Sequence, residues 1–401
     1  MKPLKLNKKS YKTIIGIMTG TSLDGVDVLI VKIKGAGAGI SYKNIAFEVY
    51  PIPAALRVSM REIMRLKTAG LETLCSLNYE IAALYESCVK KICVKNRLNL
   101  SEIDLIAISG QTFYHIPGRA TMQLGDGSFL AARTGVNVAW NFRASDIAAG
   151  GQGAPLVPYL DYVLFSKYKK DIITLNIGGI SNLTHIPASG DFDDITAFDC
   201  GPGNMIIDKM TFEYSGGKKK YDRDARIAAG GKISNELLKL MSSHEYLALA
   251  PPKSTGRETF GDEYTRGIID YCTKKNIAFN DMIRTATEFS SFCIINGIEK
   301  HLLKKIKNGR KNTNGGETFL VCAGGGARNP IIFGGIKERL AGFGIKTVKS
   351  EEFGIDSKSK EALLMAVLAN DTLYGIPSNV PSATGAKKNV ITATMSFQQN
   401  A

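Results

Sequence analysis

One carboxylate, Asp199, stands where a short β-type run meets a series of glycines. The run Ile195–Phe198 precedes it, and Gly201 and Gly203 follow within four residues. Because glycine has no Cβ, such a turn would place Asp199 on closely approaching backbone instead of a packed face. An acid held there could act as a general base beside a nucleotide's phosphates. The alternative is an Asp that only closes a turn, as this residue type commonly does.

Two further glycine turns could hold phosphate groups. The stretch Thr174–Asn182 reads as a strand that runs through Asn176 into Gly178 and Gly179, a turn that could lie against phosphate oxygens. Near the N-terminus, residues 20–25 read Gly-Thr-Ser-Leu-Asp-Gly. Their two hydroxyls, two glycines and one acid suit the wrapping of a phosphate, with Asp24 beside a hydrated metal. An ordinary hairpin loop would also contain Gly and Asp.

Other glycine-rich segments offer contacts to a sugar or a nucleoside. Gly324, Gly325 and Gly326 follow a buried strand and precede a helix, so a flat ring or a ribose could lie directly on their backbone. The loop over residues 148–155 has too many glycines for a helix interior. Together with Arg143, Asp146 and Gln152, this loop could offer donors and acceptors to sugar hydroxyls.

The elements that must position these residues follow a repeated plan. Residues 12–18 and 26–33 read as two strands around the first turn, and residues 172–177 and 183–186 repeat the arrangement around Gly178 and Gly179. Two sheets, each presenting a glycine hairpin, would clamp a nucleotide between two lobes. A helical stripe through Leu74, Leu77, Ile81, Leu84 and Cys88 indicates core packing, as does the apolar run 361–368. The polar stretch 307–317 reads as a loop.

Composition excludes several classes of protein. The 401 residues are 44% hydrophobic and 22% charged, which is typical of a globular chain with a large core. The net charge of +14 is scattered, without the aromatic-interleaved basic stripe of a nucleic-acid binder. Seven cysteines show no C-x-x-C pair and favour the reducing cytoplasm, and no apolar run approaches membrane-spanning length. We therefore expect neither a nucleic-acid nor a membrane partner.

Taken together, the motifs resemble those of one family, the anhydro-N-acetylmuramic acid kinases of the actin, Hsp70 and sugar-kinase superfamily. Each motif alone is weak, but eight in the same order are highly specific. The resemblance covers nearly the whole chain, through Gly20–Gly25, Gly110–Thr112, Gly150–Pro158, Asn176–Gly179, Phe198–Asn204, Pro252–Glu258, Val321–Ala327 and Ser382–Ala386.

The resemblance implies a fold and a reaction. The fold would be a two-lobed α/β actin-like ATPase (ribonuclease H-like) with an internal duplication and a central cleft. Residues 1–140 would form the N-terminal lobe, completed by the C-terminal segment, and residues 141–401 the second lobe. The enzyme would use ATP and Mg²⁺ to open the 1,6-anhydro ring of its sugar and phosphorylate it, in the recycling of bacterial cell wall. It would act as a cytoplasmic homodimer on a small-molecule anhydro sugar.

The resemblance also implies roles for individual residues, although it names no metal ligand. Asp199 would be the general base, and Glu361 would contact the sugar together with Gln111, Thr112, Arg143 and Gln152. The nucleotide would be bound by the first hairpin turn and by the two later glycine turns, that is, by Gly20, Thr21, Ser22, Leu23, Asp24, Gly25, Val26, Asp27, Asn176, Gly178, Gly179, Gly324, Gly325 and Gly326.

Three positions depart from the family pattern. Asn141 stands where the family usually has Asp, Ser109 replaces a His, and Ala323 is an extra residue before the glycine triplet. These departures bear on the geometry of sugar and adenosine binding. A kinase of another anhydro sugar, such as levoglucosan, is the alternative within enzymes. An ATP-gated binding module of the same superfamily is the alternative from another class.

Overall fold

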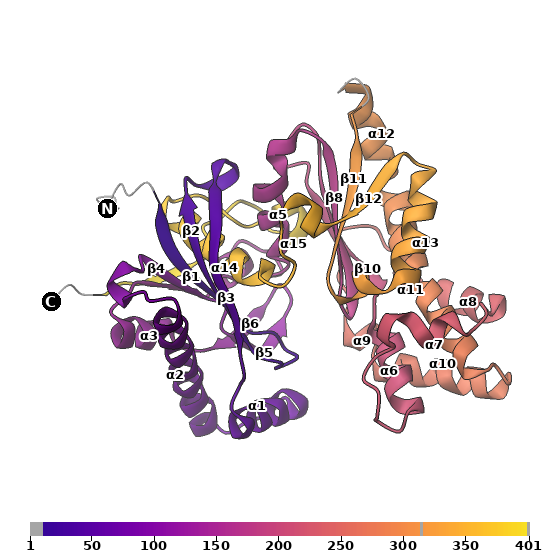
Figure 1. Ribbon diagram of the computed structural model, residues 1–401, viewed down its shortest axis with the longest axis horizontal. Helices are drawn as coiled ribbons and strands as arrows, with labels where there is room; N and C mark the ends of the chain where they lie inside the picture. The colour runs from indigo at the N-terminus through magenta and orange to yellow at the C-terminus, as the bar shows by residue number, and fades with distance from the viewer. Residues whose placement is uncertain (1–10, 313–315, 399–401) are drawn as a thin grey trace. The chain divides into compact units, whose positions relative to one another are not determined.

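The computed structural model describes residues 11–312 and 316–398, which fall into two compact units. Unit 1 comprises Met1–Lys167 and Lys358–Ala401, and unit 2 comprises Tyr168–Ser357. Figure 1 shows that each unit is built around a sheet of its own. Mixed helices and strands confirm the α/β class expected from the sequence.

The boundary expected after residue 140 lies elsewhere in the structure. Residues 141–167 belong to unit 1, because helix α5 (Val157–Phe165) packs against helix α14 (Lys360–Leu373). The hydroxyl of Tyr159 on α5 donates a 2.7 Å hydrogen bond to Asp371 on α14, and both side chains are buried. Unit 1 therefore consists of two segments that lie far apart in the sequence.

The sheet of unit 1 has the strand order β13-β7-β4-β1-β2-β3. Strands β1 and β2 form the expected N-terminal hairpin and pair antiparallel, as do β2 and β3, whereas β4 runs parallel to β1 and to β7. The strands span Lys12–Met18 (β1), Val26–Lys34 (β2), Ser41–Tyr50 (β3), Leu105–Ile108 (β4), Val138–Trp140 (β7) and Thr394–Ser396 (β13).

The sheet of unit 2 repeats this topology in the order β10-β9-β8-β11-β12. Its hairpin β8–β9 and the pair β9–β10 are antiparallel, whereas β11 runs parallel to β8 and to β12. Five strands of each unit thus share one order and one set of directions, which confirms the internal duplication. The strands span Asp171–Ile177 (β8), Ile180–Ile186 (β9), Thr196–Pro202 (β10), Thr318–Ala323 (β11) and Ile345–Lys349 (β12).

Helices cover both faces of the sheet in unit 1. Alternate residues Ile15 and Ile17 of β1 pack in one core cluster with Leu77, Ile81 and Cys88 of α2 (Leu71–Lys95), as the helical stripe predicted. Helix α14 packs on β1, β2 and β4. It approaches β1 so closely at Gly16 that a Cβ there would lie 2.0 Å from the carbonyl oxygen of Ala362. This contact holds the first turn of α14 against the sheet.

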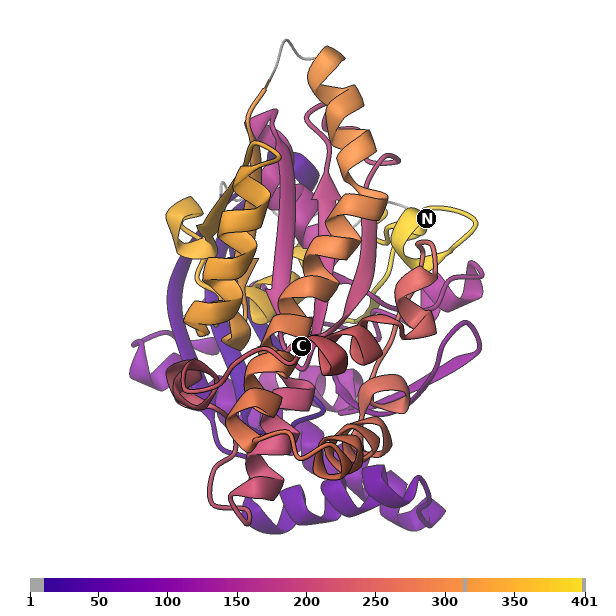
Figure 2. The ribbon, with the colours of Figure 1, turned by 90° about the vertical axis from the view of Figure 1, so that its right-hand side faces the viewer.

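In unit 2, helices α11 (Phe279–His301) and α13 (Pro330–Ala341) pack against each other and on the strands. Figure 2 shows these orange helices in front of the magenta strands. The polar segment expected to form a loop over 307–317 is helical as far as Asn312, because α12 (Leu303–Asn312) follows directly on α11, with Leu302 and Ile306 buried. Residues 313–315 lie outside the described part.

The remaining elements are short helices and one small sheet. None of the helices in residues 11–312 and 316–398 is long and apolar enough to cross a membrane. Unit 1 also contains α1 (Ala54–Leu66), β5 (Gln111–Ile116), β6 (Ala120–Leu124), α3 (Gly127–Thr134), α4 (Ala144–Ala148) and α15 (Pro381–Thr384). Unit 2 also contains α6 (Met205–Tyr214), α7 (Arg226–Ala229), α8 (Asn235–Ser242), α9 (Arg257–Phe260) and α10 (Asp262–Lys274).

Candidate functional site

Asp199 lies within strand β10. The sequence had indicated a place at the end of the strand instead. The strand continues to Pro202 through a β-bulge, because Asp199 pairs with Asn182 while Gly201 pairs with the preceding residue, Ser181. Cys200 is the extra residue and is buried. Bulges bend a strand and re-aim its side chains, and they are frequent beside active sites. Gly201 therefore belongs to the bulge, whereas Gly203 follows the end of the strand.

The segment 253–255 surrounds Asp199 with hydrogen bonds. The backbone N–H of Asp199 donates to the carbonyl oxygen of Lys253 at 3.1 Å. Its carboxylate oxygen Oδ2 accepts from the N–H of Thr255 at 2.9 Å and from the hydroxyl of Ser254 at 3.1 Å. On the other side, the hydroxyl of Tyr246 donates to the carbonyl oxygen of Asp199 at 2.8 Å. Sequence reasoning assigned no role to these neighbours, although Pro252–Glu258 is one of the segments that carry the family resemblance.

The charge of Asp199 is set by opposing influences. Burial raises the pKa of its carboxyl above the ordinary value, while the hydrogen bonds from Thr255 and Ser254 lower it. The negative charge of Glu258 adds to the increase, and the positive charge of Lys253 opposes it. Asp199 is thus a partly desolvated carboxyl with a raised pKa and donors that favour its ionised form, which suits a general base.

The glycine turns of unit 2 meet at the end of β8. The N–H groups of Gly203 and Asn204 donate to the carbonyl oxygens of Gly179 and Gly178, each at 2.8 Å. A Cβ on Gly203 would lie 2.5 Å from the Gly178 oxygen, so only glycine fits at that position. The structure therefore brings the turn after β8 against the segment that follows Asp199.

The glycine triplet after β11 reaches the same place. A Cβ on Gly324 would lie 2.7 Å from the side-chain oxygen of Asn176, and one on Gly326 would lie 2.2 Å from Cγ2 of Ile177. Gly324 also has a φ of +87°, which favours glycine. The candidates Asn176, Gly178, Gly179 and Gly324–Gly326 are consequently neighbours in unit 2.

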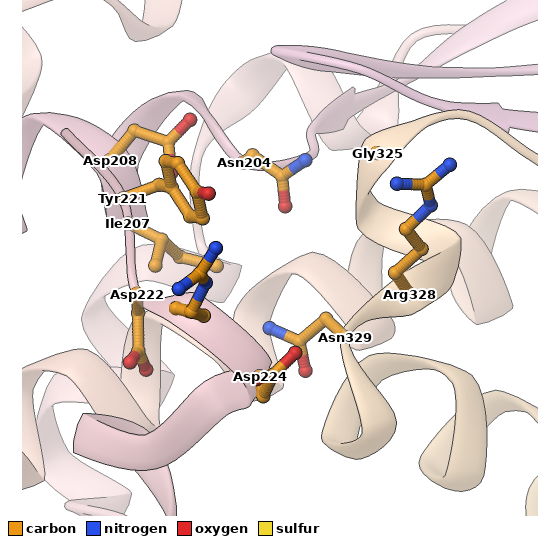
Figure 3. A pocket seen from close by; sticks show the side chains of 10 residues that line it. Asn204, Ile207, Asp208, Tyr221, Asp222, Asp224, Gly325, Arg328 and Asn329 are labelled. Carbon is orange, nitrogen blue, oxygen red and sulfur yellow. The ribbon is translucent and has the colours of Figure 1, made fainter. Parts of the chain in front are cut away.

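A cavity of about 480 Å³ opens beside these turns in unit 2. Figure 3 shows Asp208 and Tyr221 on one side of it, with Gly325, Arg328 and Asn329 on the other. Burial, followed by the negative charge of Asp222, raises the pKa of Asp208 to about 7. A polar cavity of this size beside bare glycine backbone can hold a nucleoside. The sequence did not single out Asp208 or Tyr221, because no local pattern shows that they share a cavity with the glycine triplet.

In unit 1, the turn between β1 and β2 presents small polar side chains to solvent. Thr21, Ser22 and Asp24 are exposed. Leu23 and Val26 are buried in the core of the unit, so they anchor the turn and could contact a ligand only through their backbone. The turn therefore leaves two hydroxyls available for a ligand's phosphates and one carboxylate available for a metal ion.

Two acidic side chains and one basic side chain lie near this turn. The pKa of Asp27 on β2 rises to about 6, through burial and then through the charges of Glu361 and Asp24. Glu361, in the first turn of α14, is exposed to water, yet the protein atoms around its carboxyl desolvate it enough to raise its pKa. The charge of Glu361 in turn opposes the lowering of the Arg143 pKa by burial. The structure thus groups Asp27, Glu361 and Arg143, which lie far apart in the sequence.

Two of the polar residues expected to face a sugar are fully buried. Asp146 is fully buried, and its Oδ2 accepts from the N–H of Gly153 at 2.7 Å. Its Oδ1 accepts from Asn379 at 2.8 Å and from the hydroxyl of Thr384 at 2.7 Å. Gln111 is also fully buried and donates to the carbonyl oxygen of Gly20 at 3.4 Å. The expectation that Asp146 binds a sugar directly is wrong, because its oxygens are already used inside the fold.

The other expected sugar contacts are more accessible. Arg143 donates to the carbonyl oxygen of Gly153 at 2.8 Å, and a guanidinium has further N–H groups to offer. Gln152 is half-buried, and its backbone N–H donates to Thr384 at 2.8 Å. Thr112 is half-buried, and its hydroxyl accepts from Gln123 at 3.3 Å. No group of three or more His, Cys, Asp or Glu in the described ranges is placed to hold a metal ion.

Comparisons with known proteins agree on one family. The sequence model of the family "Anhydro-N-acetylmuramic acid kinase" matches residues 12–397. A protein of that name from Clostridioides difficile is 40% identical over 383 residues, which cover 94% of this chain and 96% of the relative. One from Francisella tularensis subsp. novicida is 39% identical over 394 residues, covering 96% and 99%. One from Caldanaerobacter subterraneus is 35% identical over 403 residues, covering 98% and 99%.

Among solved structures, the chain is similar to an activator of the 2-hydroxyisocaproyl-CoA dehydratase from Clostridium difficile with bound ADPNP. The TM-score is 0.41 at 11% identity, and the alignment covers 91% of this chain and 96% of the other.

Proposed function

Because the chain belongs to the family of anhydro-N-acetylmuramic acid kinases, we propose that it uses ATP to convert anhydro-N-acetylmuramic acid into N-acetylmuramic acid 6-phosphate and ADP. One observation carries the proposal within the structure: Asp199 sits on a bulged strand, beside the glycine turns of unit 2, with donors fixed on one side of its carboxylate. This arrangement suits a general base that works close to a nucleotide.

The substrate explains why such a base is needed. An anhydro sugar has no free 6-hydroxyl, so a base has no hydroxyl proton to remove there. Asp199 instead takes a proton from water, whose oxygen forms a bond to the anomeric carbon. The bond from that carbon to the 6-oxygen breaks, and the 6-oxygen attacks the γ-phosphorus. The bond from the γ-phosphorus to the bridging oxygen of ADP then breaks, and Asp199 returns its proton to solvent.

Each unit offers a nucleotide a different kind of group: unit 2 offers glycine backbone, and unit 1 offers polar side chains. We assign the nucleoside to the cavity between Asp208 and Arg328, with its ring or ribose on Gly324–Gly326. Gly178 lies beside this cavity, because its carbonyl oxygen accepts from the N–H of Asn204, which lines the cavity, and Gly179 is the next residue of the same turn. We assign phosphate contacts to these two glycines and to the turn over residues 20–27, whose exposed hydroxyls can donate to phosphate oxygens.

Magnesium fits the same turn. This ion keeps several waters and is held by one or two carboxylates together with substrate phosphates, so it needs no cluster of three protein ligands. Asp24 is exposed, and Asp27 lies on the adjoining strand with a pKa of about 6, which leaves it largely ionised at neutral pH. Bound Mg²⁺ supplies charge stabilisation for the transferring phosphoryl group.

The sugar is assigned to the polar groups of unit 1. Glu361 and Arg143 carry opposite charges that interact, and Thr112 and Gln152 are partly accessible. Such a set can both accept from hydroxyls and donate to a carboxylate, which anhydro-N-acetylmuramic acid carries on its lactyl group. Gln111 contributes by holding Gly20, and not by direct contact. Action in the cytoplasm, as a homodimer, belongs to the same proposal.

A coupled assay of ADP release tests the function. We expect release that depends on anhydro-N-acetylmuramic acid, with little release for levoglucosan or for ATP alone. Preferential turnover of levoglucosan would show that the chain acts on another anhydro sugar. ADP release that is independent of sugar would support an ATP-gated module instead and would overturn the proposal. Running the reaction in heavy-oxygen water should label the anomeric hydroxyl of the product and not its phosphate.

A further inference from the structure

The two carboxylate oxygens of Asp199 have different surroundings. Oδ2 accepts two hydrogen bonds, from the N–H of Thr255 at 2.9 Å and from the hydroxyl of Ser254 at 3.1 Å. Oδ1 accepts none from the part of the chain that the structure describes. A carboxylate oxygen with two donors has little remaining capacity to accept a proton, so the two oxygens cannot do the same chemistry.

The backbone on which the carboxylate stands is also fixed from both sides. The N–H of Asp199 donates to the carbonyl oxygen of Lys253, and its own carbonyl oxygen accepts from Tyr246. Tyr246 is buried, and the ammonium group of Lys253 lies 4.8 Å from the centroid of its ring. The residues on either side of Ser254 are therefore bound to the same strand as the carboxylate. Ser254 itself remains exposed, and of the two donors to Oδ2 it is the one that a side-chain substitution removes.

We propose that Ser254 is a positioning residue, which together with the N–H of Thr255 holds Oδ2 of Asp199 and leaves Oδ1 as the atom that takes the proton from water. The inference rests on the proposed function of Asp199 as the base. It assigns a task to the Lys-Ser-Thr-Gly segment, which resembles a phosphate loop in composition only. That segment binds the base, through one side-chain donor and one backbone donor.

The same hydrogen bond should help to keep the base ionised. A donor to a carboxylate favours the charged form and lowers its pKa, against the effect of burial. The other groups that face Asp199 are Glu258, Lys253, Tyr246 and Cys200; Glu258 raises the pKa of Asp199, and Lys253 lowers it. Loss of the Ser254 hydroxyl leaves these groups in place, so the pKa of Asp199 should move upward.

The pH dependence of kcat/KM for the sugar tests this inference in the full-length enzyme. In Ser254→Ala, we expect the acid limb of the profile to move up by about half to one pH unit, since one charge-assisted hydrogen bond is lost at an exposed position. On the acid limb, at pH values below the pKa of Asp199 in both enzymes, kcat/KM should fall roughly three- to tenfold, with a smaller fall at pH 8 and the KM for ATP unchanged. Ser254→Thr, which keeps the hydroxyl, should behave like the parent.

Ser243→Ala is the matched control, because Ser243 is also exposed in unit 2 and its hydroxyl donates to the carbonyl oxygen of Leu240, away from Asp199. It should leave the profile unchanged. If the acid limbs of Ser254→Ala and the parent coincide while the parent is active, the role of Ser254 is refuted and the proposed function stands. If the parent shows no sugar-dependent ADP release, the proposed function fails and this inference fails with it.

Discussion

The β1–β2 turn of unit 1 and the β8–β9 turn of unit 2 hold the same place in two sheets of the same strand order. In unit 1, the turn is held by side chains: Leu23 is buried in the core, and Gln111 donates to the carbonyl oxygen of Gly20. In unit 2, the turn at Gly178 and Gly179 is held by the backbone N–H groups that follow Asp199. One topology thus supports two kinds of turn.

The difference matches the tasks assigned to the two units. A turn held by side chains on its inner face can expose Thr21, Ser22 and Asp24 to phosphates and a metal. A turn packed against other glycine backbone exposes no side chain, and it lets flat groups approach closely. We therefore expect unit 1 to be sensitive to changes of buried polar side chains, and unit 2 to be sensitive to a methyl group added to a glycine.

The largest effect on stability is expected in unit 1, for Asp146→Asn. The substitution keeps the volume but turns an amide N–H₂ toward donors, which include the N–H of Gly153 and the side chain of Asn379. A buried group left with unmatched donors should lower the free energy of unfolding by about 3 kcal/mol. Chemical denaturation measures this change. Glu62→Gln, an acid-to-amide change at an exposed position of the same unit, is the control and should have little effect.

A smaller decrease in the free energy of unfolding is expected in unit 2, for Gly326→Ala. The added Cβ would lie 2.2 Å from Cγ2 of Ile177, a fully buried residue of β8 that has no room to move. Overpacking of this kind costs about 2 kcal/mol. The comparison is Gly20→Ala in unit 1, where the nearest atom, the hydroxyl of Ser22, would be 3.6 Å away. Equal losses in the two variants would remove the distinction between the turns.

The smallest effect concerns Asp208, and it depends on pH. Its pKa in the folded chain is about 7, above the value of an unfolded carboxyl, so the folded state binds more protons. The resulting cost is absent below the unfolded pKa, grows as pH rises, and is complete above about pH 7. Asp208→Asn should therefore raise the free energy of unfolding by about 1 kcal/mol at pH 8, a value that includes screening by the solvent around this half-buried group. The increase should be much smaller at pH 4.

Melting temperatures of Asp208→Asn and the parent across this pH range provide the measurement. Asp270→Asn, at an exposed position of α10, serves as the control and should show no such trend. A variant that is equally destabilised at both pH values would contradict the raised pKa of Asp208.

Local sequence patterns were sufficient for the elements of both hairpins. Short runs of apolar and β-branched residues predict β1, β2 and β8, and the glycine turns predict where these strands end. The repeated plan was visible for the same reason, since each hairpin is contiguous in the chain. Asp199 was recognised from the glycines that follow it, although its place within a bulged strand was not.

Interactions between distant segments were beyond the reach of those patterns. The unit boundary depends on α5 packing against α14, and the task of Asp146 depends on Asn379 and Thr384, more than 200 residues away. Ser254 reaches Asp199 across 55 residues, and Asp208 faces the glycine triplet only because α6 starts where β10 ends. Only tertiary structure brings these partners together.

The direct test of the account is the turnover of Asp199→Asn with anhydro-N-acetylmuramic acid, together with ATP binding by the same variant. Asn has nearly the shape of Asp but cannot take a proton, so we expect sugar-dependent ADP release to fall by about three orders of magnitude or more while the affinity for ATP stays close to that of the parent. Turnover within a few-fold of the parent would contradict the assignment of Asp199 as the base.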